Sequence, residues 1–204
     1  MTVTKIEAFG KNRHRIYIDE RRAFVLYKGE LSRYKIREGE VLGEESYREI
    51  VDSVLVKRAK LRCMNLLKSM DRTEWQLRQK LEQGEYPQDI IDTAVAYVKS
   101  YGYVDDISYA SRYIDSRQQS RSRRQIICEL QQKGIEKDVI LAAYEEKDPV
   151  DERALIYRLL EKKHMEPRAA TPKEKQKMYM FLMRKGFSSS EVSKVLRGGE
   201  YDFC

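Results

Sequence analysis

The stretch SRRQIICELQQKGIEKDVI, residues 122–140, contains the pattern that decides the fold. Its apolar residues recur with helical period up to a glycine, an apolar residue follows, and a second short amphipathic segment begins. Lys133–Gly134–Ile135 is typical of a helix C-cap, because glycine readily adopts the left-handed conformation and the next apolar side chain packs back on the last turn. The stretch therefore predicts a helix, a tight glycine turn and a second helix.

The same pattern occurs before and after this stretch. It returns as EWQLRQKLEQGEYPQDII at residues 74–91 and as QKMYMFLMRKGFSSSEVSKVL at residues 176–196. The glycines Gly84, Gly134 and Gly186 are 50 and 52 residues apart. A further helical segment precedes each copy, at Val54–Ser69, Ile107–Gln118 and Val150–Lys163. The repetition predicts three tandem three-helix units of about 50 residues each.

Signals for helix starts lie where this scheme requires them. Pro172 stands in the favoured first position of its helix, and Asp148–Pro149 is expected to start a helix at Val150 in the same way. Three pairs have the spacing of a capping box: Thr73 with Gln76, Thr171 with Glu174, and Ser188 with Glu191.

The first forty residues have a different pattern. TKIEAF, HRIYIDE and RAFVLYKG are rich in β-branched and aromatic residues, and turns are expected at Gly10–Asn12 and Asp19–Glu20. We therefore expect a mainly α protein, in which three tandem three-helix repeats form an elongated, curved body behind a small N-terminal β-rich module. The expected boundaries are residues 1–50 for the module and 51–104, 105–147 and 148–204 for the repeats.

The composition indicates a basic protein with a large solvated surface. The 204 residues include 40 Lys and Arg against 33 Asp and Glu, which gives a formal net charge of +7. No apolar run is long enough to cross a bilayer, and the N-terminus lacks the apolar region of a signal peptide. Three dispersed cysteines, Cys63, Cys128 and Cys204, argue against a disulfide framework and fit a reducing cytoplasm. We expect Cys63 and Cys128 to be small core residues.

The sequence offers no set of residues for catalysis or metal binding. His14 and His164 have no cysteine, carboxylate or histidine at metal-ligand spacing, and RGGEYD near the C-terminus lacks the context of a phosphate-binding loop. Asp105–Asp106 is interpreted as a helix N-cap rather than a catalytic pair. We therefore expect no enzyme activity, no bound metal and no cofactor.

Arginines are concentrated between two predicted helices. Arg117 stands near the end of the first, and Arg121, Arg123 and Arg124 stand at the start of the second, so all four should surround one corner. Arginines at a helix N-terminus oppose the helix dipole, whereas guanidinium groups suit two-pronged contacts with phosphate or carboxylate. Two interpretations remain open: a solvated helix face, and a docking surface for phosphates or for an acidic protein groove.

Two further features could mediate binding. Trp75, between Arg72 and Arg78, could stack on a base or anchor a partner, but we expect it to pack with the leucines of its own helix as core. The run Tyr179–Met183 is almost entirely apolar, which is wider than one helix face normally buries. We expect core and a seam between units there, with a partner site as the second interpretation.

The residues from Gly102 to Ile135, GYVDDISYASRYIDSRQQSRSRRQIICELQQKGI, resemble the central segment of the RecX family. The family pattern combines a Gly-aromatic/Leu-hydrophobic-Asp-Asp-x-x-aromatic-Ala run, an arginine-rich stretch and Arg-x-Ile-x-x-Glu-Leu-x-x-Lys-Gly-Ile. RTEWQLRQKL, residues 72–81, is similar to the family's first-unit motif, and the first residues are similar to the N-terminal extension of many Gram-positive members. The central pattern is matched by Gly102, Val104, Asp105, Asp106, Tyr109, Ala110, Arg117, Arg124, Ile126, Glu129, Leu130, Lys133, Gly134 and Ile135. The chain departs from the family at Ser122, where glycine is frequent, near Arg123, where proline or lysine is frequent, and most in the third unit.

RecX proteins are regulators of the RecA recombinase. The resemblance therefore implies a three-repeat protein that lodges in the groove of the RecA filament on DNA and restrains ATP hydrolysis and strand exchange. We accordingly expect a cytoplasmic monomer that meets no membrane and whose partners are the RecA filament and single- or double-stranded DNA. The alternative is a basic DNA-binding protein that contacts phosphates through the second-repeat arginines. The expected contact residues are Arg117, Arg121, Arg123, Arg124 and Lys133, then Arg72, Trp75 and Arg78, and last Arg184 and Lys185.

Overall fold

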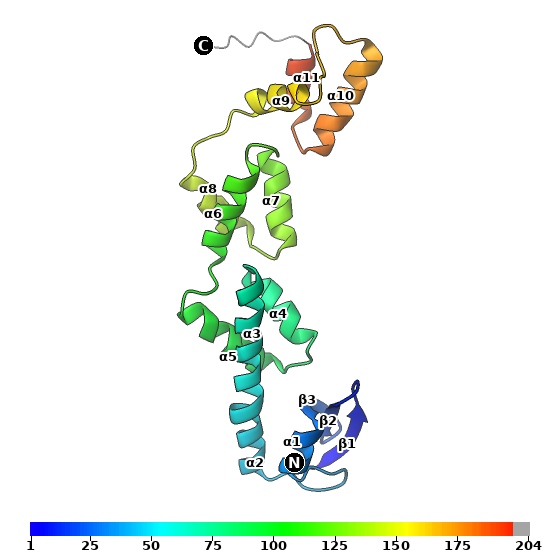
Figure 1. Ribbon diagram of the computed structural model, residues 1–204, viewed down its shortest axis with the longest axis vertical. Coiled ribbons are helices and arrows are strands. Elements are labelled where there is room, and N and C mark those ends of the chain that lie inside the picture. Colours follow the sequence, from blue (N-terminus) through cyan, green and yellow to red (C-terminus); the bar gives the residue numbers. More distant parts are fainter. Residues whose placement is uncertain (198–204) are drawn as a thin grey trace. The chain divides into compact units, whose positions relative to one another are not determined.

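The computed structural model of the protein describes residues 1–197, and its contacts divide the chain into two compact units, with the division after Asp105. The first unit combines a sheet with helices, and the described part of the second contains helices only (Figure 1). Cys204 and most of the RGGEYD segment lie outside the described residues. Within residues 1–197, no helix is both long enough and apolar enough to span a bilayer.

The N-terminal sheet is antiparallel with strand order β1-β2-β3. Its strands are β1 (Val3–Ala8), β2 (Arg13–Ile18) and β3 (Arg21–Tyr27). Gly10 lies in the first turn with a φ of 78°, and Asp19 and Glu20 form the second turn with φ of 47° and 66°. Two successive positive φ values match the twist of a two-residue hairpin. The three predicted strands and both turns are confirmed.

The third strand ends earlier than the sequence pattern suggested. RAFVLYKG was expected to be extended up to Gly29, but the chain is helical from the start of α1 (Lys28–Arg33). Tyr27 is the N-cap, and its backbone N–H donates to the Glu30 carboxylate at 2.7 Å. This bond satisfies a helix-end donor at the point where the strand stops.

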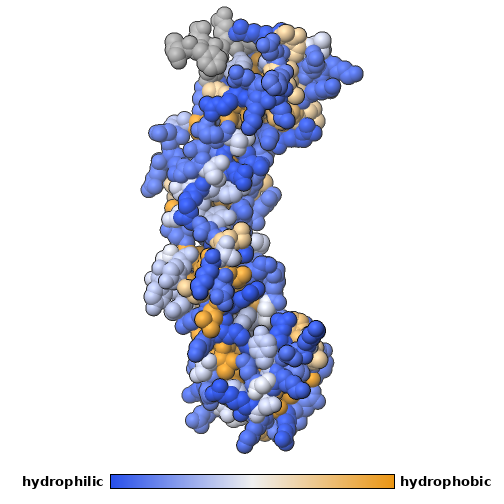
Figure 2. Space-filling view, in the orientation of Figure 1, coloured by the Kyte–Doolittle hydropathy of each residue, from blue (hydrophilic) through white to orange (hydrophobic). Residues whose placement is uncertain are grey.

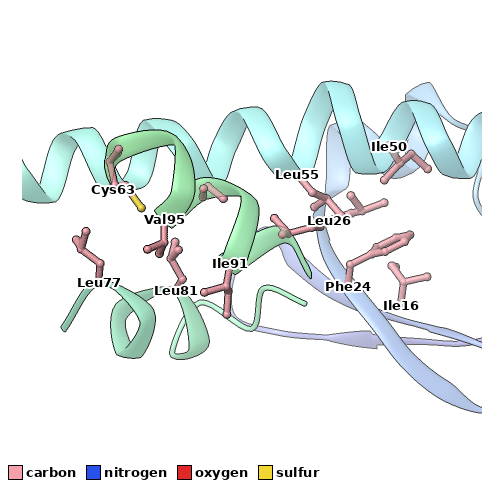
Figure 3. Packing of buried hydrophobic residues seen from close by; sticks show 14 of the residues in the cluster. Ile16, Phe24, Leu26, Ile50, Leu55, Cys63, Leu77, Leu81, Ile91 and Val95 are labelled. Atoms are coloured by element: carbon pink, nitrogen blue, oxygen red, sulfur yellow. The ribbon is translucent and has the colours of Figure 1, made fainter. Parts of the chain in front are cut away.

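A long helical stretch carries the core of the first unit. It consists of α2 (Glu44–Glu49), a π-helical segment (Ile50–Val56) and α3 (Lys57–Ser69). The helix thus begins well before the expected Val54. Its buried residues contact the sheet at one end, where Ile50 and Leu55 lie beside Phe24 (Figure 3). Towards the other end, buried Cys63 lies near the leucines of the next helix, which confirms its predicted core position.

The predicted three-helix repeats are confirmed. The first is α3, α4 (Glu74–Glu82) and α5 (Gln88–Ser100). The second is α6 (Asp106–Arg117), α7 (Arg123–Gln132) and α8 (Lys137–Glu145). The third is α9 (Glu152–Glu161), α10 (Pro172–Arg184) and α11 (Ser189–Leu196). The second and third repeats each have a buried cluster of their own, whereas the first shares one continuous cluster with the sheet. The sheet and the first repeat therefore form one body.

Two glycine turns have the predicted geometry. Gly134 and Gly186 adopt φ of 82° and 81°. The backbone N–H of Ile135 donates to the Leu130 carbonyl at 3.2 Å, and Phe187 forms the equivalent bond in the third repeat at 3.3 Å. Both apolar residues are buried, so each turn returns a side chain to the core of its repeat.

The first repeat makes this turn with a different residue. Gly84 was expected to be the equivalent of Gly134, but the left-handed residue is Glu85, with a φ of 59°. Leu81 accepts from the N–H of Tyr86 at 3.3 Å, so Glu85 occupies the place that glycine takes in the other repeats. A non-glycine residue in this region costs on the order of 1–3 kcal/mol. Arg15 of β2 compensates by donating two hydrogen bonds to the Glu85 carboxylate, at 2.6 and 2.8 Å.

The helix starts agree with the sequence in two cases. Thr73 accepts from the N–H of Gln76 at 3.2 Å, and Thr171 forms the same bond with Glu174 at 3.4 Å. Both capping boxes are complete. Ser188 accepts from Glu191 N–H, but the Glu191 carboxylate turns to Arg153 on α9 at 2.6 Å.

Two sequence-based expectations in the second unit are wrong. Asp148–Pro149 does not start α9, because the N-cap is Asp151, whose carboxylate accepts from the Arg153 backbone N–H at 2.8 Å. Cys128 is exposed on α7 rather than buried. Ile126 and Leu130, two residues before and after it, fill the buried face of that helix.

The contribution of the Arg15–Glu85 contact to stability can be tested by substitution. Arg15 holds the pKa of the Glu85 carboxyl below its ordinary value. Glu85→Gln should lower the free energy of unfolding by about 1–2 kcal/mol at neutral pH, since hydrogen bonds to a charged group are lost. Because the folded pKa is depressed, this stabilisation is complete above the ordinary carboxyl pKa of about 4.3 and is lost as pH falls through the folded value.

Urea unfolding of the parent protein and Glu85→Gln at pH 7 and at pH 3 measures this effect. The stability difference should shrink at the lower pH. Glu82→Gln, at the exposed last position of α4, is the control and should change little at either pH. If Glu85→Gln lowers the free energy of unfolding equally at both pH values, the charge of Glu85 does not contribute to stability.

Candidate partner-binding site: the arginine corner

Four arginines, Arg117, Arg121, Arg123 and Arg124, surround the turn between α6 and α7 and are here named the arginine corner. Arg117 ends α6, Arg123 begins α7, and Arg121 lies in the turn. The turn is fixed by Ser122, a fully buried N-cap whose hydroxyl accepts from the Gln125 N–H at 3.1 Å. The structure therefore places these residues together, as the spacing predicted.

Arg121 is engaged inside the repeat. Its guanidinium forms an ion pair with the Glu129 carboxylate at 2.5 Å. The same carboxylate accepts from the Tyr113 hydroxyl at 2.8 Å. Burial raises the pKa of Tyr113, and the bond to Glu129 raises it further. Glu129 thus neutralises one of the four arginines and joins α6 to α7.

Aromatic rings hold two arginines of the corner and a lysine near it. Arg117 lies 5.7 Å from the centre of the Tyr113 ring, and Lys133, at the end of α7, lies 5.4 Å from it. Arg123 lies 4.5 Å from the centre of the Tyr144 ring, whose pKa burial raises to about 12. A cation over a ring face keeps its charge and retains N–H donors for further hydrogen bonds. These contacts restrict the side chains without neutralising them.

Arg124 differs from its neighbours. It is exposed, and within residues 1–197 it forms no ion pair. It is the second residue of α7, and Trp75 is the second residue of α4 in the first repeat. Trp75 is 44% exposed, so the expectation that it packs as core is wrong. The second helical position faces solvent in both repeats, whereas the buried face begins at Leu77.

The other candidates in the first unit are mostly engaged. Arg78 donates to the Glu74 carboxylate at 2.9 Å and also forms an ion pair with Asp92. Arg78 lowers the pKa of Asp92 through this bond. Lys99 completes the network with a 2.6 Å contact to Glu74. Arg72 is half-buried, and its Nε has no hydrogen-bond partner in the described part of the chain.

The third repeat adds a cation to the arginine corner. A Cβ atom placed on Gly186 would lie 2.6 Å from the Ser122 hydroxyl and 3.0 Å from the Cβ of Gln125. The turn that contains Lys185 and Gly186 therefore lies against the first turn of α7. Arg158 of α9 also reaches this region, where it donates to the Gln119 side chain at 2.5 Å. Arg184, by contrast, is exposed at the end of α10.

The apolar run of α10 serves mainly as core. Met178 and Leu182 are buried, and three residues of the run pack partly buried against the same cluster: Tyr179, Phe181 and Met183. Met180 is 54% exposed. The visible face of each unit is otherwise predominantly hydrophilic (Figure 2).

Sequence reasoning missed Tyr113, Glu129 and Arg158 as parts of this site. Tyr113 and Glu129 lie on different helices and meet only when α6 packs on α7. Their hydrogen bond therefore cannot be predicted from local spacing in the sequence. Among residues 1–197, no three His, Cys, Asp or Glu side chains are grouped so that they could hold a metal ion. His14 is half-buried in β2, and His164 is exposed beyond the end of α9.

Comparison with known proteins decides the family. Three family models match the chain. The models for the first, second and third three-helix domains of RecX match residues 59–97, 105–143 and 151–196, respectively. The chain is 31% identical over 198 residues to a regulatory protein RecX of Caldanaerobacter subterraneus subsp. tengcongensis, with 96% of this chain and 98% of the relative covered. The chain belongs to the RecX family.

Further RecX proteins extend the match. A regulatory protein RecX of Clostridium perfringens strain 13 is 26% identical over 200 residues, covering 97% of this chain and 94% of the relative. A crystal structure of a regulatory protein RecX is similar with a TM-score of 0.60 at 25% identity, covering 96% and 98% of the two chains. RecX from Lactobacillus salivarius shares the fold, with a TM-score of 0.58 at 18% identity over 71% of this chain and 96% of that chain. The names of these RecX relatives support a regulatory role.

The contact at Gly186 can be tested by substitution. Gly186→Ala should lower the free energy of unfolding for two reasons: its φ is left-handed, and the new Cβ would meet Ser122. Gly102→Ala is the matched control, since Gly102 has a φ of 70° but nothing within 4 Å of an added Cβ. Strain alone should cost Gly102→Ala about 1–2 kcal/mol.

Urea unfolding of both variants separates the two effects. Gly186→Ala should be the more destabilising, and limited proteolysis should cut it faster between α8 and α9. Equal losses in the two variants would mean that the packing of this turn against α7 contributes nothing.

Proposed function

We propose that this RecX family member binds the RecA filament on DNA through its arginine corner and restrains ATP hydrolysis and strand exchange. The choice of RecA as the partner rests on the family resemblance, since RecX proteins are regulators of RecA. The proposal that the arginine corner is the binding surface is supported by the cations around the α6–α7 turn, where Arg117 and Arg123 are held over aromatic rings.

The chemistry of the corner favours an acidic partner. Arg123 and Arg124 stand at the N-terminus of α7, where positive charge is unfavourable for the helix itself. Their presence therefore has a better explanation in binding than in folding. Because the rings hold Arg117, Arg123 and Lys133 near their positions, less side-chain entropy is lost when a carboxylate or phosphate is bound. Lys185 extends the same positive region from the third repeat.

The interactions of each side chain within the protein rank the residues by their expected contribution to partner binding. Arg124 and Arg123 come first, and Arg117, Lys133 and Lys185 support them. Arg121 has a smaller role, because Glu129 already neutralises it. Trp75 is the best candidate anchor of the first unit, since it is exposed and Arg78 is engaged in ion pairs.

Arg124→Glu separates binding from folding. A carboxylate at this helix start should leave the melting temperature unchanged or raise it, with a gain of about 0.3–1 kcal/mol from the helix dipole. The same change should raise the concentration needed for half-maximal inhibition of RecA ATPase on single-stranded DNA by about tenfold. Lys137→Glu, at the exposed start of α8, is the matched control and should keep full inhibition. Inhibition by Arg124→Glu equal to that of the control would contradict the proposed surface.

A second function, direct DNA binding, is favoured by the exposure of Arg124. It predicts binding to naked single- or double-stranded DNA whose affinity falls steeply with salt, and a shallower slope in Arg124→Ala. Fluorescence anisotropy with labelled DNA from 50 to 200 mM salt measures this slope. Weak binding to naked DNA together with strong binding to the RecA filament would exclude it as the main function.

A further inference from the structure

A cavity of about 570 Å³ lies within the first unit, between β2, β3, α3 and the turn that follows α4. Its volume is in the range of pockets that take small organic ligands. The sheet, the long helix and the α4–α5 turn each supply part of its lining, including the strands' Arg13 and Tyr27 and the turn's Gly84. The cavity belongs to a single compact unit, and none of its lining residues belongs to the arginine corner.

The lining is strongly positive. Arg13 from β2, Arg62 from α3 and Lys80 from α4 line the cavity, and within residues 1–197 none of these three cations forms an ion pair. The one carboxylate in the lining is Glu85, which already receives two hydrogen bonds from Arg15 outside it. Cations without a close ion-pair partner around one concave surface repel one another and attract an anion, although Arg13 also feels the charge of Glu85.

A fourth cation, Arg58, is fixed at the cavity wall. Its Nη1 contacts the Glu30 carboxylate at 3.2 Å, and its Nη2 donates to the Val25 carbonyl at 2.8 Å. The guanidinium also lies 4.9 Å from the centre of the Tyr27 ring and 5.9 Å from that of Tyr86. Its Nε is buried and has no hydrogen-bond partner among residues 1–197. Glu30 and the Val25 carbonyl therefore hold this guanidinium in place at the cavity wall.

The remaining lining is apolar and amide-bearing. Leu61 is 55% exposed and Tyr27 is 43% exposed, so apolar surface is open to a ligand beside the cations. Asn65 and Gln83 add side-chain amides, and the Gln83 amide oxygen already accepts from Lys80 Nζ at 3.0 Å. A planar heterocyclic base could use the apolar wall and the amides, while a phosphate dianion would use the cations. A single carboxylate carries one negative charge and would leave more of the positive charge unbalanced than a phosphate dianion would.

We propose that this cavity binds a nucleotide, with its phosphate among Arg13, Arg62 and Lys80 and its base against Leu61 and Tyr27. A free nucleotide and a nucleotide within a single strand both present a base and a phosphate, which is a dianion in the first and a monoanionic diester in the second. The site goes beyond the proposed function, because neither RecA nor the arginine corner takes part in it.

Calorimetric titration of the full chain with dTMP and with thymidine tests the phosphate requirement. The dTMP nucleotide should bind one to one and at least about tenfold more tightly than thymidine. Arg62→Ala and Lys80→Ala should each weaken dTMP binding by about tenfold, because each removes one charge contact to phosphate. Arg62→Lys should restore part of the affinity.

Two controls lie on the same long helix. Lys57→Ala and Lys68→Ala change exposed lysines that do not line the cavity, and both should bind dTMP as the parent protein does. An equal loss of dTMP binding in these variants would overturn the proposal, since it would show a nonspecific charge effect. Thermal unfolding of all variants checks that Arg62→Ala and Lys80→Ala remain folded.

An oligothymidylate of about ten nucleotides distinguishes the two sources of the nucleotide. Oligothymidylate binding that is tighter than dTMP binding and is lost in Arg62→Ala identifies a single strand as the ligand. A loss confined to dTMP identifies the free nucleotide. The proposal is overturned if neither probe responds to Arg62→Ala or Lys80→Ala, or if a tri-aspartate peptide binds these residues more tightly than both. Since RecA is absent, this outcome leaves the RecA-based function untouched.

Discussion

In each repeat the chain reverses between its second and third helices at one left-handed residue, and the fold depends on that reversal. Only there can the following side chain, Tyr86, Ile135 or Phe187, return to the core of its own repeat. Glycine meets the conformational requirement directly in the second and third repeats. In the first repeat the left-handed residue is Glu85, and Arg15 of β2 donates two hydrogen bonds to its carboxylate. The same turn therefore also attaches the sheet to the helices.

The arginine corner follows from the same geometry. The buried Ser122 cap fixes where α7 begins, and the first helical positions then project outward as Arg123 and Arg124. Tyr113 and Tyr144 lie beneath Arg117 and Arg123, and neither aromatic contact was predicted from the sequence. The corner is thus a set of positioned charges. Its charge is smaller than the count of arginines suggests, because Glu129 offsets Arg121.

Periodicity and capping signals predicted most of the fold, since both act over a few residues. The strands, the three-helix repeats and the caps at Thr73 and Thr171 follow from local chemistry. The errors arise where a pattern leaves the direction of a side chain open. Trp75 and Cys128 have helical spacing to apolar neighbours yet lie on the exposed face. For the site, the sequence placed the arginines at one turn, but their partners come from other helices and required tertiary packing.

The long helix of the first unit has a broader consequence. Its π-helical segment carries Ile50 and Leu55 into the sheet, and the next turns carry Cys63 into the helical part of the same core. The N-terminal extension is therefore not an independent appendage. A relative without those strands would have to replace the side chains equivalent to Ile50 and Leu55 with polar ones, or cover them with another segment, to remain free of aggregation.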